Sequence, residues 1–225
     1  MVYFKQQQWP ERSPAVVMRP SLPRMSEGIS EAAMPATITI TQPTTAAPAV
    51  APTTWQIDPS HSTAEFAVRH MMVSTVKGHV SSVEGTISLD ETDLAHSSVT
   101  VSLDAASIDT REPKRDVHLR SADFLDVEQF PKITFSSTRI EHDRDGYRIL
   151  GDLTIRDVTR EMGLEAAFEG QQRDPWGGER AGFTAQGAID RRDFGLTWNQ
   201  PLPGAGVMLG NDVRISIELE AVLKA

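Results

Sequence analysis

The sequence of 225 residues contains no cysteine. Disulfides, thiolate nucleophiles and zinc or iron–sulfur centres held by cysteine are therefore excluded. Long hydrophobic runs are missing as well, and no stretch reaches the roughly 18–20 apolar residues that a membrane-spanning helix needs. We expect no integral membrane segment.

Basic residues are scarce relative to acidic ones. The chain has 22 Lys and Arg against 31 Asp and Glu, which gives a formal charge of −9. Residues 1–52 carry +1, so the remainder carries −10. Because clustered Lys and Arg drive binding to nucleic acids, an acidic body predicts no nucleic-acid partner.

Motifs of the common enzyme classes are also absent. The chain contains no Gly-x-Ser-x-Gly elbow, and Asp193-Phe194-Gly195 matches a kinase motif without the other kinase segments. No two of the six histidines have the His-x-His or His-x-x-x-His spacing that favours a metal site. We predict neither a catalytic site nor a metal or cofactor.

The N-terminal segment differs from the rest in composition. Eight of the 14 prolines lie in residues 1–52, which predicts a disordered segment. The best candidate for a secretory signal, 15–18, is too short and lies between Pro14 and Pro20. We therefore expect a cytoplasmic protein whose native start is Met34, with one folded domain over 53–225.

In that domain the hydrophobic pattern has a period of two, as in half-buried strands. Only one segment favours a helix, which Pro113 can open, with a second short turn that begins at Asp126 and ends at Pro131. The pattern predicts an all-β fold, either a closed antiparallel up-and-down barrel or a two-sheet sandwich with Greek-key topology. The alternation predicts eight strands, over 62–69, 74–90 with a bend near Gly85, 98–105, 132–142, 147–156, 161–169, 183–190 and 213–221.

A series of segments resembles a known family. They are Ile57-Asp58-Pro59-Ser60-His61-Ser62, 66–72, 76–78, 108–110, 114–124 with its Arg-Asp-x-His-Leu-Arg-Ser run, 130–135, 151–155 and 192–196. In order and spacing they resemble the YceI family of lipid-binding, lipocalin-like proteins, over residues 55–223. The resemblance implies an eight-stranded antiparallel barrel with a short helical insert and an apolar tunnel that holds a polyisoprenoid or similar amphiphile. His79 and Glu112 depart from the family pattern, which suggests a different headgroup preference.

Physical reasoning without the family resemblance also supports a tunnel. The alternative is a barrel whose interior is filled by packed side chains. An eight-stranded barrel can either be filled by side chains or hold one small ligand. Tryptophan is nearly absent from the predicted strands, so a filled barrel would lack its bulkiest plugs. By alternation, the predicted ligand-binding residues on the strands are Phe66, Val68, His70, Val101, Leu103, Phe135, Ile149, Leu153, Ile155, Leu164, Phe168 and Phe183. Met71 and Trp198 are added as predicted ligand-binding residues of the two rims.

Polar residues near the predicted tunnel have two interpretations. His70 shares a face with Phe66 and Val68, where its imidazole either meets a ligand headgroup or bonds to the backbone at the strand end. Met71 suits an adaptable entrance, and Trp198 lies in a Gly- and Pro-rich loop that forms a second rim. We interpret Arg115, Asp116, His118 and Arg120 as a structural plug beneath the barrel rather than as ligand contacts.

We therefore predict a non-enzymatic carrier that buries the tail of an isoprenoid or fatty-acyl ligand; a homodimer is possible. The alternative is a lipid-modifying isomerase or hydrolase on the same barrel, with His70 as acid or base. Such an enzyme needs a carboxylate beside His70, and the inward faces assigned above contain no Asp or Glu.

Overall fold

The structure is a computed structural model, which describes residues 51–143, 146–203 and 206–224. These residues belong to the compact unit Ala46–Ala225. The predicted disorder of residues 1–52 and the predicted start at Met34 fall almost entirely outside the described residues.

The described part of the chain forms eleven strands, one α-helix and four 3-10 helices. The strands are β1 (Thr53–Ile57), β2 (Thr63–His70), β3 (Ser74–Val80), β4 (Val83–Leu89), β5 (Ser98–Asp104), β6 (Ile108–Asp109), β7 (Lys132–Asp143), β8 (Gly146–Ile155), β9 (Val158–Arg173), β10 (Glu179–Asp190) and β11 (Leu209–Leu223). The helices are η1 (Pro59–His61), η2 (Leu94–His96), η3 (Ala105–Ser107), α1 (Pro113–Arg120) and η4 (Arg191–Phe194).

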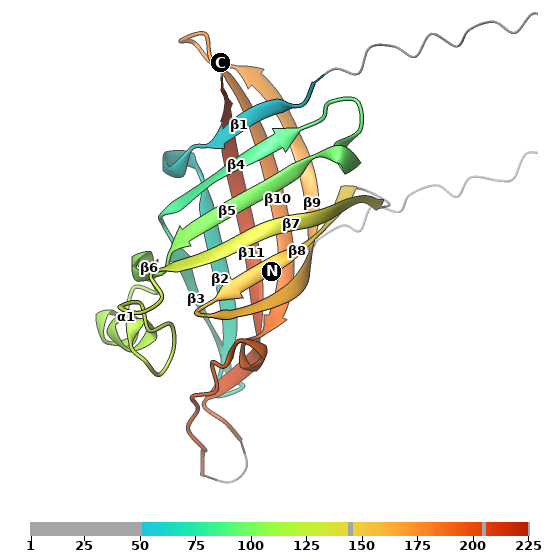
Figure 1. Cartoon of the computed structure of the whole chain (residues 1–225). Coiled ribbons are helices and arrows are strands. Elements are labelled where there is room, and N and C mark those ends of the chain that lie inside the picture. The colour runs from blue at the N-terminus through green and yellow to red at the C-terminus, as the bar shows by residue number, and fades with distance from the viewer. Residues whose placement is uncertain (1–50, 144–145, 204–205, 225) are drawn as a thin grey trace, which may run out of the picture. The chain divides into compact units, whose positions relative to one another are not determined.

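The strands close into a barrel because β11 is paired along both edges. One edge pairs with β10, and the other pairs with β2 and then with β1. β1 with β2, β3 with β4, and β5 with β6 each run as one strand with an interruption, so the eleven segments make eight antiparallel strands in sequence order. The predicted eight-stranded antiparallel up-and-down barrel is confirmed, and the Greek-key sandwich is not formed (Figure 1).

The predicted strand 74–90 is interrupted at Ser81–Ser82 and not at Gly85. The N–H of Ser82 donates to Ser107 Oγ in η3 at 3.1 Å instead of to a ladder neighbour, while its carbonyl accepts from Asp104 N at the end of β5 at 3.1 Å. Gly85 allows the backbones of β4 and β5 to approach each other closely, because a Cβ there would lie 2.2 Å from Thr100 O. Strand β1 was not predicted, since its five residues are too few to show alternation.

Helix α1 begins at Pro113, as predicted, and the carboxylate of Glu112 accepts a hydrogen bond from Lys114 N at its first turn. Arg120 binds the segment to the barrel edge by donating to Ala106 O at 2.8 Å and Ile108 O at 2.7 Å. The turn that follows at Asp126 is also present, since Phe130 N donates to Asp126 O at 2.8 Å. α1 therefore lies outside the barrel near β6 (Figure 1).

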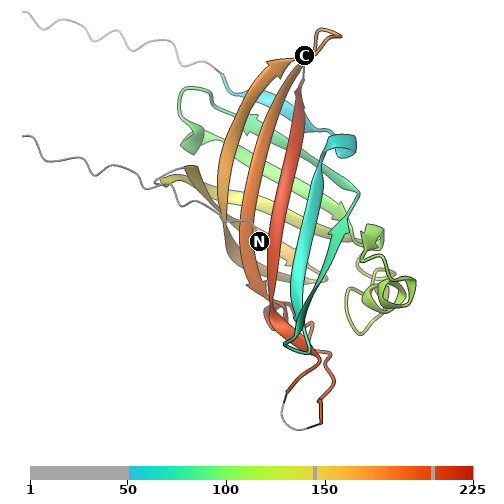
Figure 2. The same ribbon diagram turned by 180° about the vertical axis from the view of Figure 1, so that it is seen from behind.

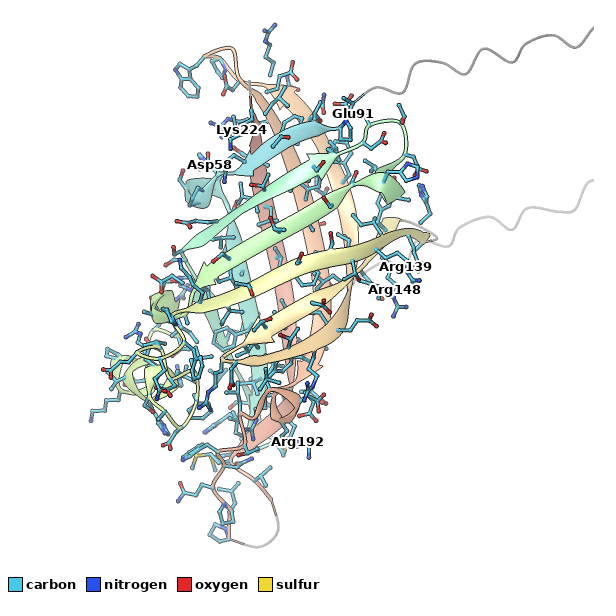
Figure 3. The ribbon with its side chains drawn as sticks, in the orientation of Figure 1. Asp58, Glu91, Arg139, Arg148, Arg192 and Lys224 are labelled. Atoms are coloured by element: carbon cyan, nitrogen blue, oxygen red, sulfur yellow. The ribbon has the colours of Figure 1, made fainter. Side chains whose placement is uncertain are left out.

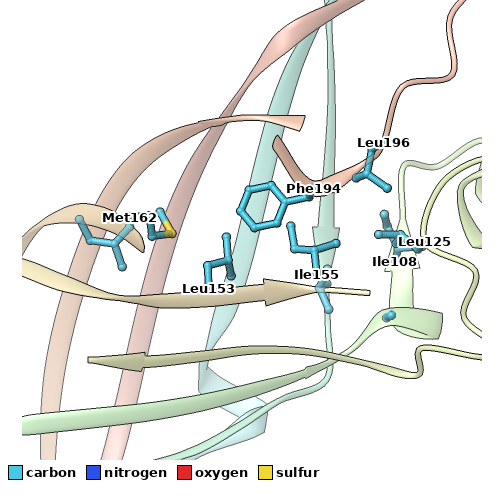
Figure 4. Close-up of a cluster of buried hydrophobic side chains, with 10 residues drawn as sticks. Ile108, Leu125, Leu153, Ile155, Met162, Phe194 and Leu196 are labelled. Carbon is cyan, nitrogen blue, oxygen red and sulfur yellow. The ribbon is translucent and has the colours of Figure 1, made fainter. Parts of the chain in front are cut away.

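Buried apolar side chains form two clusters. The first lies on the α1 side and includes Leu153, Ile155, Phe194 and Leu196 (Figure 4). The second is centred on Trp55, which is fully buried between β4 and β11. Among residues 51–143, 146–203 and 206–224, no helix combines the length and the hydropathy needed to cross a bilayer.

Candidate lipid-binding cavity

A cavity of about 640 Å³ lies inside the barrel, between walls contributed by both clusters. Leu103 and Ile217 contact both clusters and line the cavity, so they mark the middle of the barrel. Strand alternation explains the wall, because every second side chain of an amphipathic barrel strand points inward.

Inward side chains in the middle of the barrel are only partly buried. Val101, Phe135, Ile149 and Ile215 are each of intermediate exposure, although all line the cavity. A side chain in a close-packed interior has neighbours on all sides. These residues instead face empty space, so the plainly packed core considered from the sequence does not describe the barrel.

The structure places all but one of the predicted ligand-binding residues on the cavity wall. Those on the wall are Phe66, Val68, His70, Val101, Leu103, Phe135, Ile149, Leu153, Ile155, Leu164, Phe168, Phe183 and Trp198. Their contact with a ligand remains a prediction. Met71, predicted as a ligand-binding residue at the entrance, is not on the wall, because it lies in the turn after β2 and is 43% exposed. Met208, whose backbone oxygen accepts from Met71 N at 2.7 Å, lines the cavity instead.

Several wall residues were missed. Strand residues such as Val76, Val80 and Val83 follow the same alternation and could have been found by extending it. Leu119 and Phe124 come from the irregular segment around α1, where no periodicity marks them as wall residues.

An aromatic contact lies at the α1 end of the cavity. The rings of His118 and Trp198 meet edge to face with centroids 4.7 Å apart, and Phe124 packs against both. His118 Nε2 lies 2.8 Å from a carboxylate oxygen of Asp123. The 195–208 loop and the α1 segment, far apart in sequence, thus meet at this end of the barrel.

Charged residues also line the cavity: Glu65, Glu112, Lys114, Arg115 and Arg191. None of them is on the inward strand faces assigned from the sequence, which contain no Asp or Glu. Burial lowers the pKa of Arg191, which is 3% exposed. Its guanidinium donates to Trp198 O and Gly210 O, both at 2.9 Å, to Leu196 O and to Asn211 Oδ1, so it anchors the loop.

The interpretation of the α1 segment as a structural plug agrees with its hydrogen bonds. The buried carboxylate of Asp116 accepts from both N and Oγ1 of Thr110. Arg115 donates to the hydroxyl of Thr110 at 2.7 Å and to its carbonyl at 2.9 Å. Arg115 and His118 nevertheless line the cavity, so at this end the plug is also part of the wall.

His70 is the polar residue at the end of the inward face of β2. Its side chain lines the cavity and, among the described residues, has no hydrogen-bond or ion-pair partner. The bond to backbone considered from the sequence is therefore not formed. His70 is an unpaired donor and acceptor beside an otherwise largely apolar wall.

At the opposite end of the barrel, Asp58, His61 and Glu220 bring three potential ligand atoms within 4.8 Å of one another (Figure 3 labels Asp58). Arg180 already donates to Asp58 at 2.8 Å and to Glu220. Hydrogen bonds from Ser60 and Arg180 hold the pKa of Asp58 well below its usual range. The cluster is accounted for as an ion-pair network.

A closed antiparallel barrel around a largely apolar cavity defines a lipocalin-like binding barrel. Residues 55–221 match the YceI-like domain family, and the chain belongs to this family. "Protein YceI" of Escherichia coli O17:K52:H18 is 43% identical over 136 residues, which cover 60% of this chain and 71% of that protein.

Solved structures agree on the fold. The YceI protein of Campylobacter jejuni is 29% identical and superposes with a TM-score of 0.59, covering 70% of this chain and 90% of that one. A polyisoprenoid-binding domain from Saccharophagus degradans, implicated in plant cell wall breakdown, is 12% identical with a TM-score of 0.52, covering 76% of this chain and 98% of that one. This second likeness shows the fold alone.

Proposed function

We propose that the protein is a non-enzymatic carrier that holds a long-chain isoprenoid or a similar amphiphile inside the barrel. The cavity carries this proposal. Its volume of about 640 Å³ lies within the range of roughly 300–1,000 Å³ common among small-molecule sites. Burying an apolar chain there contributes about 0.8 kcal/mol per methylene.

Two further observations support an amphiphile over a pure hydrocarbon. The wall is largely apolar along the strands but carries His70, Arg115 and His118 toward the end near α1 and the 195–208 loop. A tail along the strands would place a headgroup near these side chains. The polyisoprenoid-binding neighbour shares the barrel, which makes an isoprenoid tail the first candidate.

The alternative is an enzyme that modifies a lipid. A histidine acting as acid or base is normally oriented by a carboxylate, and His70 has no such partner among the described residues. His118 does pair with Asp123, but no hydroxyl in the described part of the chain bonds to its ring. The geometry therefore favours binding over catalysis.

Native mass spectrometry of the full chain after purification without detergent tests the proposal. We expect a bound species with the mass of a long-chain lipid, released intact on denaturation. Incubation with that lipid should return it unchanged; a product of altered mass would establish the enzyme instead. If neither the purified protein nor protein incubated with farnesol or a fatty alcohol retains a ligand, the carrier proposal fails.

A further inference from the structure

Four exposed apolar side chains gather at the end of the barrel that carries the 195–208 loop. Met71, Met72 and Val73 form the turn between β2 and β3 and are 43%, 58% and 80% exposed, and Val207 in the loop is 40% exposed. The bond from Met71 N to Met208 O, 2.7 Å long, joins the turn to the loop. We call these four side chains the apolar tip.

The turn presents its methionines in an unfavourable backbone conformation. Met71 and Met72 have φ of 49° and 60°, and Val73 N donates to His70 O at 3.1 Å. A turn with positive φ at both central residues is normally built from Asn-Gly, because other side chains rarely adopt this region. Asn-Gly would suit this turn better, so folding does not explain the presence of two exposed methionines.

The tip is also set apart by its charge. Residues 69–76 and 195–211 contain no Asp or Glu, although the chain has 31 of them and a formal charge of −9. The one permanent cation in these segments is Arg69, which donates to Met72 O at 2.5 Å and Thr75 Oγ1 at 3.3 Å. An apolar projection with one adjacent arginine complements a bilayer, whose interface offers hydrocarbon beneath a layer of phosphates.

The tip is anchored to the cavity wall. Asn199 donates to Leu209 O at 2.7 Å and accepts from Leu209 N at 3.0 Å, while Arg191 binds the carbonyls at the base of the loop. His70 and Met208, each next to a residue of the tip in sequence, line the cavity. The β2–β3 turn and the start of β11 lie next to each other at this end of the barrel (Figure 2). The tip and part of the cavity wall thus belong to the same two segments.

From these observations we infer that the apolar tip docks the barrel on the surface of a phospholipid bilayer, with Met71, Met72, Val73 and Val207 in the interface and Arg69 at the phosphates. A small apolar projection that is free of carboxylates suits a fluid apolar phase. Docking in this way brings the end of the cavity next to the tip against the membrane. Docking itself is independent of the proposed function; only the transfer of a ligand through this end rests on it.

Co-flotation of the full chain with vesicles of dioleoylphosphatidylcholine tests the inference. The double variant M71N/M72G removes two apolar side chains and installs the residues that the turn prefers. We expect it to unfold at a higher temperature than the parent while its partitioning to vesicles falls at least about tenfold. Because the fold is stabilised, lost partitioning cannot be attributed to unfolding.

The matched control is Trp176→Ser. Trp176 lies in the turn between β9 and β10 at the opposite end of the barrel and is 85% exposed, more than any residue of the tip. We expect this variant to partition like the parent. Equal partitioning of M71N/M72G and the parent, an equal loss in Trp176→Ser, or no flotation of the parent would each overturn the inference. So would sedimentation showing that the parent dimerises through the tip and that M71N/M72G is monomeric.

Discussion

At the scale of single residues, His70 connects the wall of the cavity with the chemistry of its ligand. It ends β2, lines the cavity and has no side-chain partner among the described residues. An unpaired imidazole in an apolar setting gains from any hydroxyl, carbonyl or carboxylate that a ligand brings. Its contribution therefore depends on the ligand's head and not on the tail.

Replacing His70 by leucine separates these two contributions. Loss of one neutral hydrogen bond, net about 0.5–1.5 kcal/mol, should weaken binding of a hydroxyl- or quinone-headed lipid roughly 2- to 12-fold. Affinity for a pure hydrocarbon of equal length should hold or improve. Titration with a matched pair of fluorescent ligands measures both. His79→Leu, the same change on a side chain outside the wall, should alter neither affinity; equal losses for both ligands in His70→Leu would remove His70 from the site.

Asp116 shows how much the α1 segment depends on one buried carboxylate. Asp116→Ala leaves N and Oγ1 of Thr110 without their acceptor in a buried position. We expect a loss of about 2–3 kcal/mol in the free energy of unfolding, measured by urea denaturation. Asp123→Ala, at a side chain that is 55% exposed, should cost well under half as much. Similar losses in the two variants would contradict a structural role specific to Asp116.

At the scale of elements, alternation predicted most of the barrel, because inward and outward side chains of a strand differ in polarity. It failed where that difference is lost. β9 and β10 extend beyond their predicted ends to Arg173 and Glu179, where polar side chains lie on both faces. The wall residues of the α1 segment were missed because no alternation of polar and apolar side chains marks them. Met71 was predicted at the entrance, but the turn after β2 leaves it outside the wall, and no hydrophobicity pattern shows the conformation of a turn.

Residues of the cavity wall differ in how tightly they are packed, and this difference predicts opposite outcomes for the same bulky residue. Val101 is partly exposed to the cavity, whereas Leu153 is 7% exposed and packed in the first cluster. Val101→Trp should displace a long-chain ligand and cost less than about 1.5 kcal/mol of stability, while Leu153→Trp should cost about 1–3 kcal/mol or more through overpacking. Lipid occupancy by native mass spectrometry and urea denaturation measure the two effects. Unchanged occupancy in folded Val101→Trp would show that the ligand lies elsewhere.

At the scale of the whole molecule, a network of ion pairs lies at one end of the barrel and the apolar tip lies at the other. The end near η1 carries Asp58, Asp174 and Glu220 around Arg180, and the other end carries the uncharged loop and the apolar tip. Ion pairs there join η1, β10, β11 and the β9–β10 turn, at the place where β1 closes the barrel on β11. Acid should therefore destabilise the barrel at the place where β1 pairs with β11.

The direction of this pH dependence follows from lowered carboxylate pKa values. Hydrogen bonds from Ser60 and then Arg180 lower the pKa of Asp58, and backbone bonding from Gly178, followed by Arg180, lowers that of Asp174. A carboxylate with a lowered folded-state pKa stabilises the fold above its unfolded value of about 3.9, and that stability is lost as the pH falls through the folded value. Stability should thus decrease below about pH 4.

Arg180→Leu tests the assignment of this loss to the network. The variant should be less stable than the parent at about pH 7 and should lose less on acidification, so the two curves approach each other as the pH falls below about 4. Arg214→Leu removes an exposed arginine that has no ion pair in the described part of the chain, and should shift the curve by a nearly constant amount. Unfolding temperatures across this range measure all three proteins. Only a change in proton uptake on unfolding can alter the slope of stability with pH. Parallel curves for Arg180→Leu and the parent would therefore mean that the acid-sensitive carboxylates lie outside this network.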